Sequence, residues 1–116
     1  MDLKERFTEY TKNWQDKLNE DEWYFCKFRD EFTKDLMPHE AFDLIPDVIE
    51  LLFNQSDEYL VNEVVELLLT LIRLADTTEI RPTLAKHWNQ IVELLSSSMV
   101  YNKNRLAELK KLLRKE

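Results

Sequence analysis

Four acidic residues in the middle of this chain recur at the spacing of one helix face. They are separated by three, four and three positions: Glu40, Asp43, Asp47 and Glu50. On a continuous helix this spacing places the four carboxylates on one stripe. Like charges at such spacing cost a helix roughly 0.2–0.5 kcal/mol per pair, because the carboxylates repel one another. The stripe therefore indicates either an electrostatic binding surface or an acidic face that keeps the protein in solution.

Further acids follow on the next helical segment, where Glu58 and Glu66 lie on one line of the helix and Glu63 stands between them. No lysine or arginine occurs between Lys34 and Arg73 to neutralise this part of the chain. A negative surface of this kind attracts a cationic partner over long range and makes the association rate depend on salt. We therefore predict one partner-binding surface, made of Glu40, Asp43, Asp47, Glu50, Glu58, Glu63 and Glu66.

Residues suited to catalysis or metal binding are few and poorly spaced. The two histidines, His39 and His87, stand in neither a Glu-x-x-His nor a His-Glu-x-x-His pattern. The serines at 96–98 lack the flanking glycines of a nucleophile elbow. The single cysteine, Cys26, stands among aromatic residues, and we expect a small buried hydrophobic side chain there. The sequence predicts a protein that is not an enzyme, with no metal site and no cofactor; a small metal-dependent enzyme is the remaining alternative.

The charge of the chain is unevenly distributed. Its net charge is −7, with eleven acids and one cation in residues 30–72, and with six cations and two acids in residues 100–116. The acidic bulk would repel nucleic acid and an anionic membrane surface, so neither is an expected partner. The basic C-terminal residues are interspersed with leucines, as is typical of an amphipathic helix whose cations occupy the solvent-exposed face. A basic protein is the partner that the charge favours.

The chain contains no glycine in 116 residues, although average usage of about 7% would supply roughly eight. Glycine provides the positive φ angles of tight hairpin turns and the backbone clearance of phosphate-binding loops. Its absence favours an all-α fold, and the length of the chain suits one domain, 1–116. No apolar run is long enough for a bilayer, and no apolar stretch follows a basic start as in a secretory signal, so we expect a cytoplasmic protein.

Apolar residues at helical spacing predict six helices. The first runs over residues 2–18 and the second over 22–36, and both carry large aromatic side chains. Pro46 lies within the apolar stripe of the third, where it either kinks a helix or starts a new one. The fourth covers 57–75, is apolar on more than one face, and has Ser56 as its expected N-cap.

The remaining helices follow Asp76-Thr77-Thr78. One runs from about Pro82 to Leu95, and a last one follows a cap at Asn102 or Asn104. A weak internal repeat links the two halves of the chain, since the segment at 48–52 is similar to the one at 91–95. Chance similarity between two amphipathic hairpins is the alternative explanation.

A period of about 40–47 residues, with a helix, a polar turn and a second helix, resembles HEAT or armadillo hairpins. The resemblance implies three stacked helical hairpins at 1–36, 38–75 and 78–115, forming a short right-handed α-α superhelix whose first hairpin is an aromatic cap. A plain helical bundle is the alternative fold.

The small size, acidic charge, acidic stripe and lack of catalytic groups also resemble immunity proteins of bacterial polymorphic and contact-dependent toxin systems. That resemblance implies an acidic surface that blocks a basic toxin domain, commonly a nuclease. The leading hypothesis is therefore a non-catalytic protein-binding module. The alternative is a structural or adaptor domain that oligomerises through its aromatic N-terminal residues.

Overall fold

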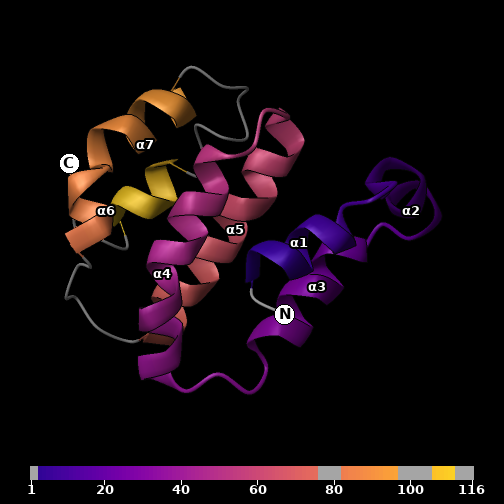
Figure 1. Ribbon diagram of the computed structural model, residues 1–116, viewed down its shortest axis with the longest axis horizontal. Helices are drawn as coiled ribbons and strands as arrows, with labels where there is room; N and C mark the ends of the chain where they lie inside the picture. The colour runs from indigo at the N-terminus through magenta and orange to yellow at the C-terminus, as the bar shows by residue number, and fades with distance from the viewer. Residues whose placement is uncertain (1–2, 76–81, 97–105, 112–116) are drawn as a thin grey trace.

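In a computed structural model of the chain, which describes residues 3–75, 82–96 and 106–111, every regular element is a helix (Figure 1). This confirms the all-α prediction. Within residues 3–96, the helices described have the bounds α1 Leu3–Tyr10, α2 Trp14–Glu20, α3 Tyr24–Thr33, α4 Pro38–Phe53, α5 Glu58–Ala75, α6 Pro82–Lys86 and α7 Trp88–Ser96. Residues 106–111 are also helical.

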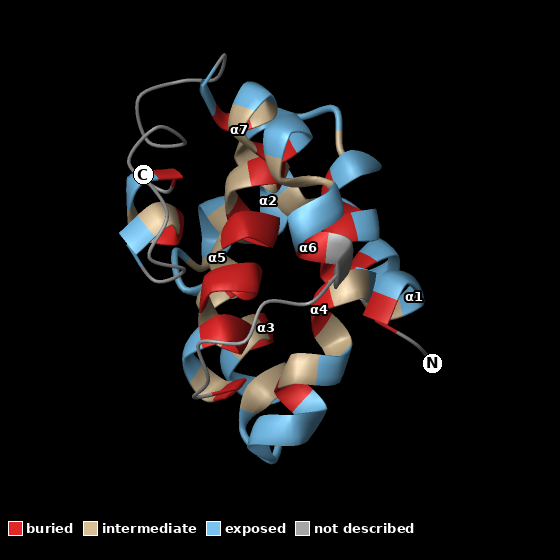
Figure 2. Cartoon of the chain, turned by 90° about the vertical axis from the view of Figure 1, so that its left-hand side faces the viewer, coloured by how far each residue is buried: buried red, intermediate tan, exposed pale blue. Residues whose placement is uncertain are grey.

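The hairpin of α4 and α5 forms the centre of the molecule. The two helices lie side by side and are joined by the short turn at 54–57. Figure 2 shows α5 buried along much of its length, because apolar side chains occupy more than one of its faces. Burying one leucine or valine side chain stabilises a fold by roughly 1.5–3 kcal/mol, so this hairpin contributes much of the core.

Shorter helices pack on the two sides of this hairpin (Figure 1). Helix α1 contacts α4 and helix α3 contacts α5, whereas α6 contacts α4 next to α7. One cluster of buried apolar side chains runs through all of these layers, from Leu3 in α1 to Leu109 near the C-terminus. The layers therefore share one hydrophobic core.

Two caps fix where the central helices begin. The Asp57 carboxylate accepts hydrogen bonds from the backbone N–H groups of Tyr59 (2.8 Å) and Leu60 (3.3 Å). The expected N-cap, Ser56, is therefore wrong by one residue, since Asp57 provides the acceptor for the free N–H groups. At the start of α4, Pro38 takes the first position, and the Met37 N–H donates to the Glu40 carboxylate at 2.9 Å.

The predicted first helix, 2–18, is broken into α1 and α2. Asn13 adopts a left-handed backbone with φ 55°, and the N–H of Trp14 donates to the carbonyl of Thr11 at 3.2 Å. Asparagine tolerates this conformation better than most residues, so it takes the role that glycine would have. The predicted helix from Pro82 to Leu95 is likewise interrupted, by a turn at 87. The caps expected at 102 and 104 lie outside the described residues.

Pro46 neither starts a new helix nor ends one, because α4 runs continuously from Pro38 to Phe53. The alternative in which Pro46 starts a new helix is therefore excluded. The four predicted acidic positions of this segment therefore belong to a single helix.

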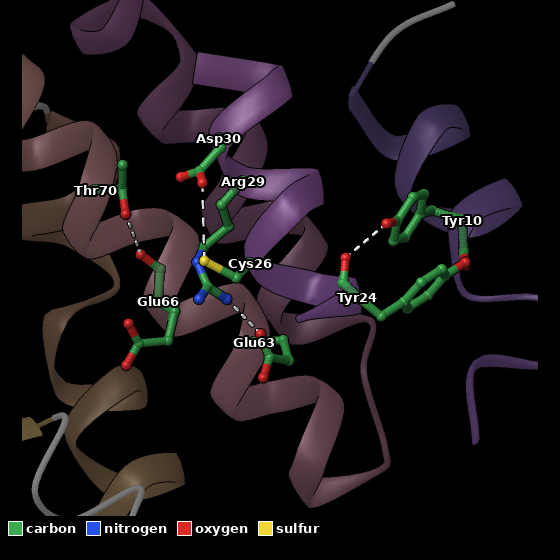
Figure 3. Close-up of polar contacts among 8 residues, drawn as sticks. All are labelled: Tyr10, Tyr24, Cys26, Arg29, Asp30, Glu63, Glu66 and Thr70. Carbon is green, nitrogen blue, oxygen red and sulfur yellow. Dashed lines mark hydrogen bonds and ion pairs between the residues drawn. The ribbon is translucent and has the colours of Figure 1, made fainter. Parts of the chain in front are cut away.

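A reciprocal pair of tyrosines joins α1 to α3. The Tyr10 hydroxyl donates to the carbonyl of Tyr24 at 2.6 Å, and the Tyr24 hydroxyl donates to the carbonyl of Tyr10 at 2.5 Å (Figure 3). Their rings stack with centroids 4.2 Å apart. The second bond supplies a donor to a carbonyl in the last turn of α1, which the helix itself leaves without one.

The environment of the tyrosine pair predicts that the Tyr10 hydroxyl ionises at a higher pH than an ordinary tyrosine. Burial, and then the nearby Tyr24, Asp21 and Glu31, raise the pKa of Tyr10 from 10.0 to about 12. Because this folded-state pKa is raised, the proton on Tyr10 contributes stability that is fully present below pH 10.0 and is lost as the pH rises toward about 12. A spectrophotometric titration should show one tyrosine ionising last, and Tyr10→Phe should remove that step. A late step that persists in Tyr10→Phe would contradict the assignment.

Candidate functional site

The exposed side of α4 carries four carboxylates. Glu40, Asp43, Asp47 and Glu50 are all exposed, and we call this set the α4 face. The opposite side of the same helix buries apolar residues, among them Ala41, Ile45 and Val48. Because α4 is continuous, the spacing of three, four and three places the four acids on one stripe, as the sequence predicts.

The contacts of Glu40 and Glu50 within the molecule leave both side chains exposed. Glu40 accepts the Met37 N–H and so also caps α4. The Glu50 carboxylate lies 3.8 Å from the ammonium group of Lys4 on α1, and both side chains are more than half exposed. A surface pair of this kind is worth about 0–1 kcal/mol and is screened by salt. It does not neutralise the stripe.

A notch of mixed polar and apolar lining lies at the C-terminal end of the α4 face. Phe53 is 39% exposed, and its ring meets the His87 ring edge-on with centroids 5.5 Å apart. A notch of about 380 Å³ is lined by Pro46, Ile49, Phe53 and His87, together with Asp47 and Glu50 of the α4 face. The imidazole of His87 in turn hydrogen-bonds the side chain of Gln90 at 2.6 Å. The notch therefore combines an exposed aromatic ring with two carboxylates at its edge.

Glu63 does not belong to this surface. Its side chain is buried within α5, and its carboxylate lies 2.5 Å from the guanidinium of Arg29 on α3 (Figure 3). The prediction that Glu63 meets a partner is thus corrected, because a buried and bonded carboxylate is not accessible. The signal was present in the sequence, since Glu63 adjoins Val64 on a helix that is apolar on more than one face.

The other two predicted acids on α5 have different surroundings. Glu66 is half-buried, and its carbonyl accepts the Thr70 hydroxyl at 2.9 Å. Glu58 is exposed in the first turn of α5, where the positive end of the helix dipole stabilises a carboxylate. Six predicted positions therefore retain some exposure, and the four of the α4 face are all exposed on one stripe of a single helix.

Groups with other chemistry lie apart from the α4 face. Cys26 is half-buried rather than fully buried, and its sulfur lies 3.8 Å from a carboxylate oxygen of Asp30. Within 3–75, 82–96 and 106–111, no cluster of three or more His, Cys, Asp and Glu side chains could hold a metal ion. Of the helices described, none has the length and apolar character needed to cross a bilayer.

Sequence reasoning did not locate the notch. Phe53 stands at the end of an apolar stripe, and His87 lies thirty-four residues later in a turn between two helices. Only the packing of α6 against α4 brings the two rings together. Comparison with known proteins finds no matching family model, no matching curated protein and no matching solved structure.

Proposed function

We propose that this chain is a non-catalytic binding module that docks a basic protein through the α4 face. The observation that carries the proposal is the exposure of four carboxylates along one uninterrupted helix. Lys4 is a nearby cation, and its contact with Glu50 is solvent-exposed and weak. Such a stripe raises the rate at which a cationic surface associates, and it selects against acidic partners.

Charge alone gives steering and specificity more than affinity, so a tight complex needs an apolar anchor. Phe53 supports this part of the proposal, because it stands partly exposed at one end of the stripe. The notch beside it is large enough to admit one apolar side chain of the partner. We expect the acids to attract the partner electrostatically and the contacts at the notch to supply most of the binding energy.

The partner that fits this surface best is a basic toxin domain, with the chain acting as its immunity protein in the cytoplasm. An inhibitor of this kind needs a complementary surface and no catalytic group. We also propose a HEAT-like stacking of the layers, supported by the central position of the α4–α5 hairpin between α1–α3 and α6–α7. The first layer then holds three helices in place of the two expected.

Affinity capture with the purified protein tests this function. The α4-face variant carries Glu40→Gln, Asp43→Asn, Asp47→Asn and Glu50→Gln; glutamine at 40 retains an oxygen that can accept the Met37 N–H. We expect a basic protein to be retained at about 0.05 M salt and released at about 0.5 M, where charge is screened within a few ångströms. The variant should bind that protein at least tenfold more weakly.

A matched control has the same change in net charge elsewhere on the molecule. Four exposed acids away from α4 are replaced: Asp16→Asn, Glu20→Gln, Glu22→Gln and Asp35→Asn. This control should bind like the unmodified protein. Equal weakening by both variants would reduce the effect to net charge, and unchanged capture by the α4-face variant would exclude the proposed surface.

A further inference from the structure

A second concave surface lies on the N-terminal layer, away from the α4 face. A groove of about 830 Å³ is lined by residues of α1, α2 and α3. Tyr10, Tyr24 and Phe28 contribute aromatic surface to it. Its volume falls in the range of about 300–1,000 Å³ that is usual for binding pockets.

The rim of this groove carries charges of both signs. Arg6, Lys17 and Lys27 supply cations, and the carboxylates of Glu20, Asp21 and Glu31 lie among them. The ammonium group of Lys17 lies 5.8 Å from the centroid of the Tyr24 ring. A rim of mixed sign differs from the α4 face, where all four members are acidic, and it does not favour a uniformly basic partner.

An exposed tryptophan lies next in the chain to residues that line the groove. Trp23 is 60% exposed and lies in the chain between Asp21 and Tyr24, both of which line the groove. The backbone N–H of Trp23 donates to one carboxylate oxygen of Asp21 at 3.0 Å. The other carboxylate oxygen of Asp21 lies 2.5 Å from the Lys27 ammonium group. Lys27 and this N–H lower the pKa of Asp21, so the carboxylate remains ionised and keeps the backbone of Trp23 in place.

We propose that the groove binds a second copy of this chain, with Trp23 of each copy entering the groove of the other. A two-fold interface apposes the same patch on both subunits, so the patch must complement itself. The patch carries both the exposed Trp23 and a groove that can receive a tryptophan side chain, so two copies can complement each other. The rim of mixed charge also complements itself, since cations of one copy can face carboxylates of the other. Tryptophan is also among the residues that contribute most to binding energy in interfaces.

This interface uses α1–α3 and is independent of the function proposed for the α4 face. Its area is small, because one ring and one groove on each side form it. We therefore expect a reversible dimer with a Kd of about 1–100 µM, in the range of weak interfaces.

Sedimentation equilibrium of the unmodified protein and two single variants provides the first test. The unmodified chain should dimerise, and Trp23→Ala should raise the dimer Kd about tenfold or more. Met37→Ala removes another exposed apolar side chain (56% exposed) and should leave the Kd unchanged. Circular dichroism checks that each variant folds. A monomer at all concentrations, or a dimer that Trp23→Ala does not weaken, would overturn the proposal.

Cross-linking then tests the groove separately. A zero-length reagent that joins lysines to carboxylates is applied to a mixture of isotope-labelled and unlabelled chains, so that links between copies are recognised by mass. We expect such links between the lysines of one rim and the carboxylates of the other, chiefly from Lys17 and Lys27. Links between copies that map only to other surfaces would refute the groove even if Trp23→Ala weakens the dimer.

Discussion

Replacing Glu63 by alanine should lower the free energy of unfolding by about 3 kcal/mol. The Arg29 guanidinium would lose the carboxylate that now lies 2.5 Å away, while its side chain remains only 21% exposed. An unpaired charge that is held away from water is costly, and this cost exceeds the worth of the ion pair itself. Urea denaturation followed by circular dichroism measures the loss.

Two further variants isolate the cause of that loss. The double variant Arg29→Met with Glu63→Leu removes both charges and should recover most of the stability, because apolar pairs often replace buried ion pairs without cost. Glu58→Ala changes an exposed acid on the same helix and should shift stability by no more than about 0.5 kcal/mol. A double variant as unstable as Glu63→Ala would mean that the charge left behind is not the cause.

Replacing Pro46 by alanine should stabilise the protein by about 1–3 kcal/mol. Proline inside a helix has no N–H to donate to the carbonyl four residues earlier, and its ring crowds that carbonyl. Its penalty relative to alanine is about 3 kcal/mol, and the partly buried ring recovers some of it through packing. Thermal unfolding of the variant should show a higher midpoint, since α4 keeps the same bounds with one more hydrogen bond.

Pro38 provides the matched control for this substitution. It occupies the first position of α4, where no hydrogen bond is lost and the fixed φ angle suits the helix start. Pro38→Ala should therefore give no gain in stability. Destabilisation by Pro46→Ala would show instead that the proline ring fits the notch beside Phe53 better than a regular helix does.

The helices and the α4 face follow from spacing in the sequence. Periodic apolar residues locate α4 and α5, and the same period places Glu40, Asp43, Asp47 and Glu50 together. This succeeds because one face of a helix depends on local geometry alone. The continuity of α4 through Pro46 did not follow, since only packing against α5 and α1 offsets the proline penalty.

Features that depend on contacts between distant residues were beyond the sequence. The apolar surroundings of Glu63 are visible in the sequence, but its ion pair with Arg29 depends on α3 lying against α5, which no local pattern shows. The break at Asn13 was missed because apolar spacing continues across it, and helix periodicity does not report a single left-handed residue. The Tyr10–Tyr24 pair joins residues fourteen positions apart through backbone carbonyls, which carry no side-chain signal.

The short turn between α4 and α5 has a consequence for the order of folding. Helices α4 and α5 are consecutive in the chain, so pairing them closes a shorter loop, at a lower entropy cost, than pairing α1 with α4 or α3 with α5. We expect this hairpin to form the folding nucleus, with α1–α3 docking after the transition state. Substitutions at Arg29 should then speed unfolding and leave the folding rate nearly unchanged.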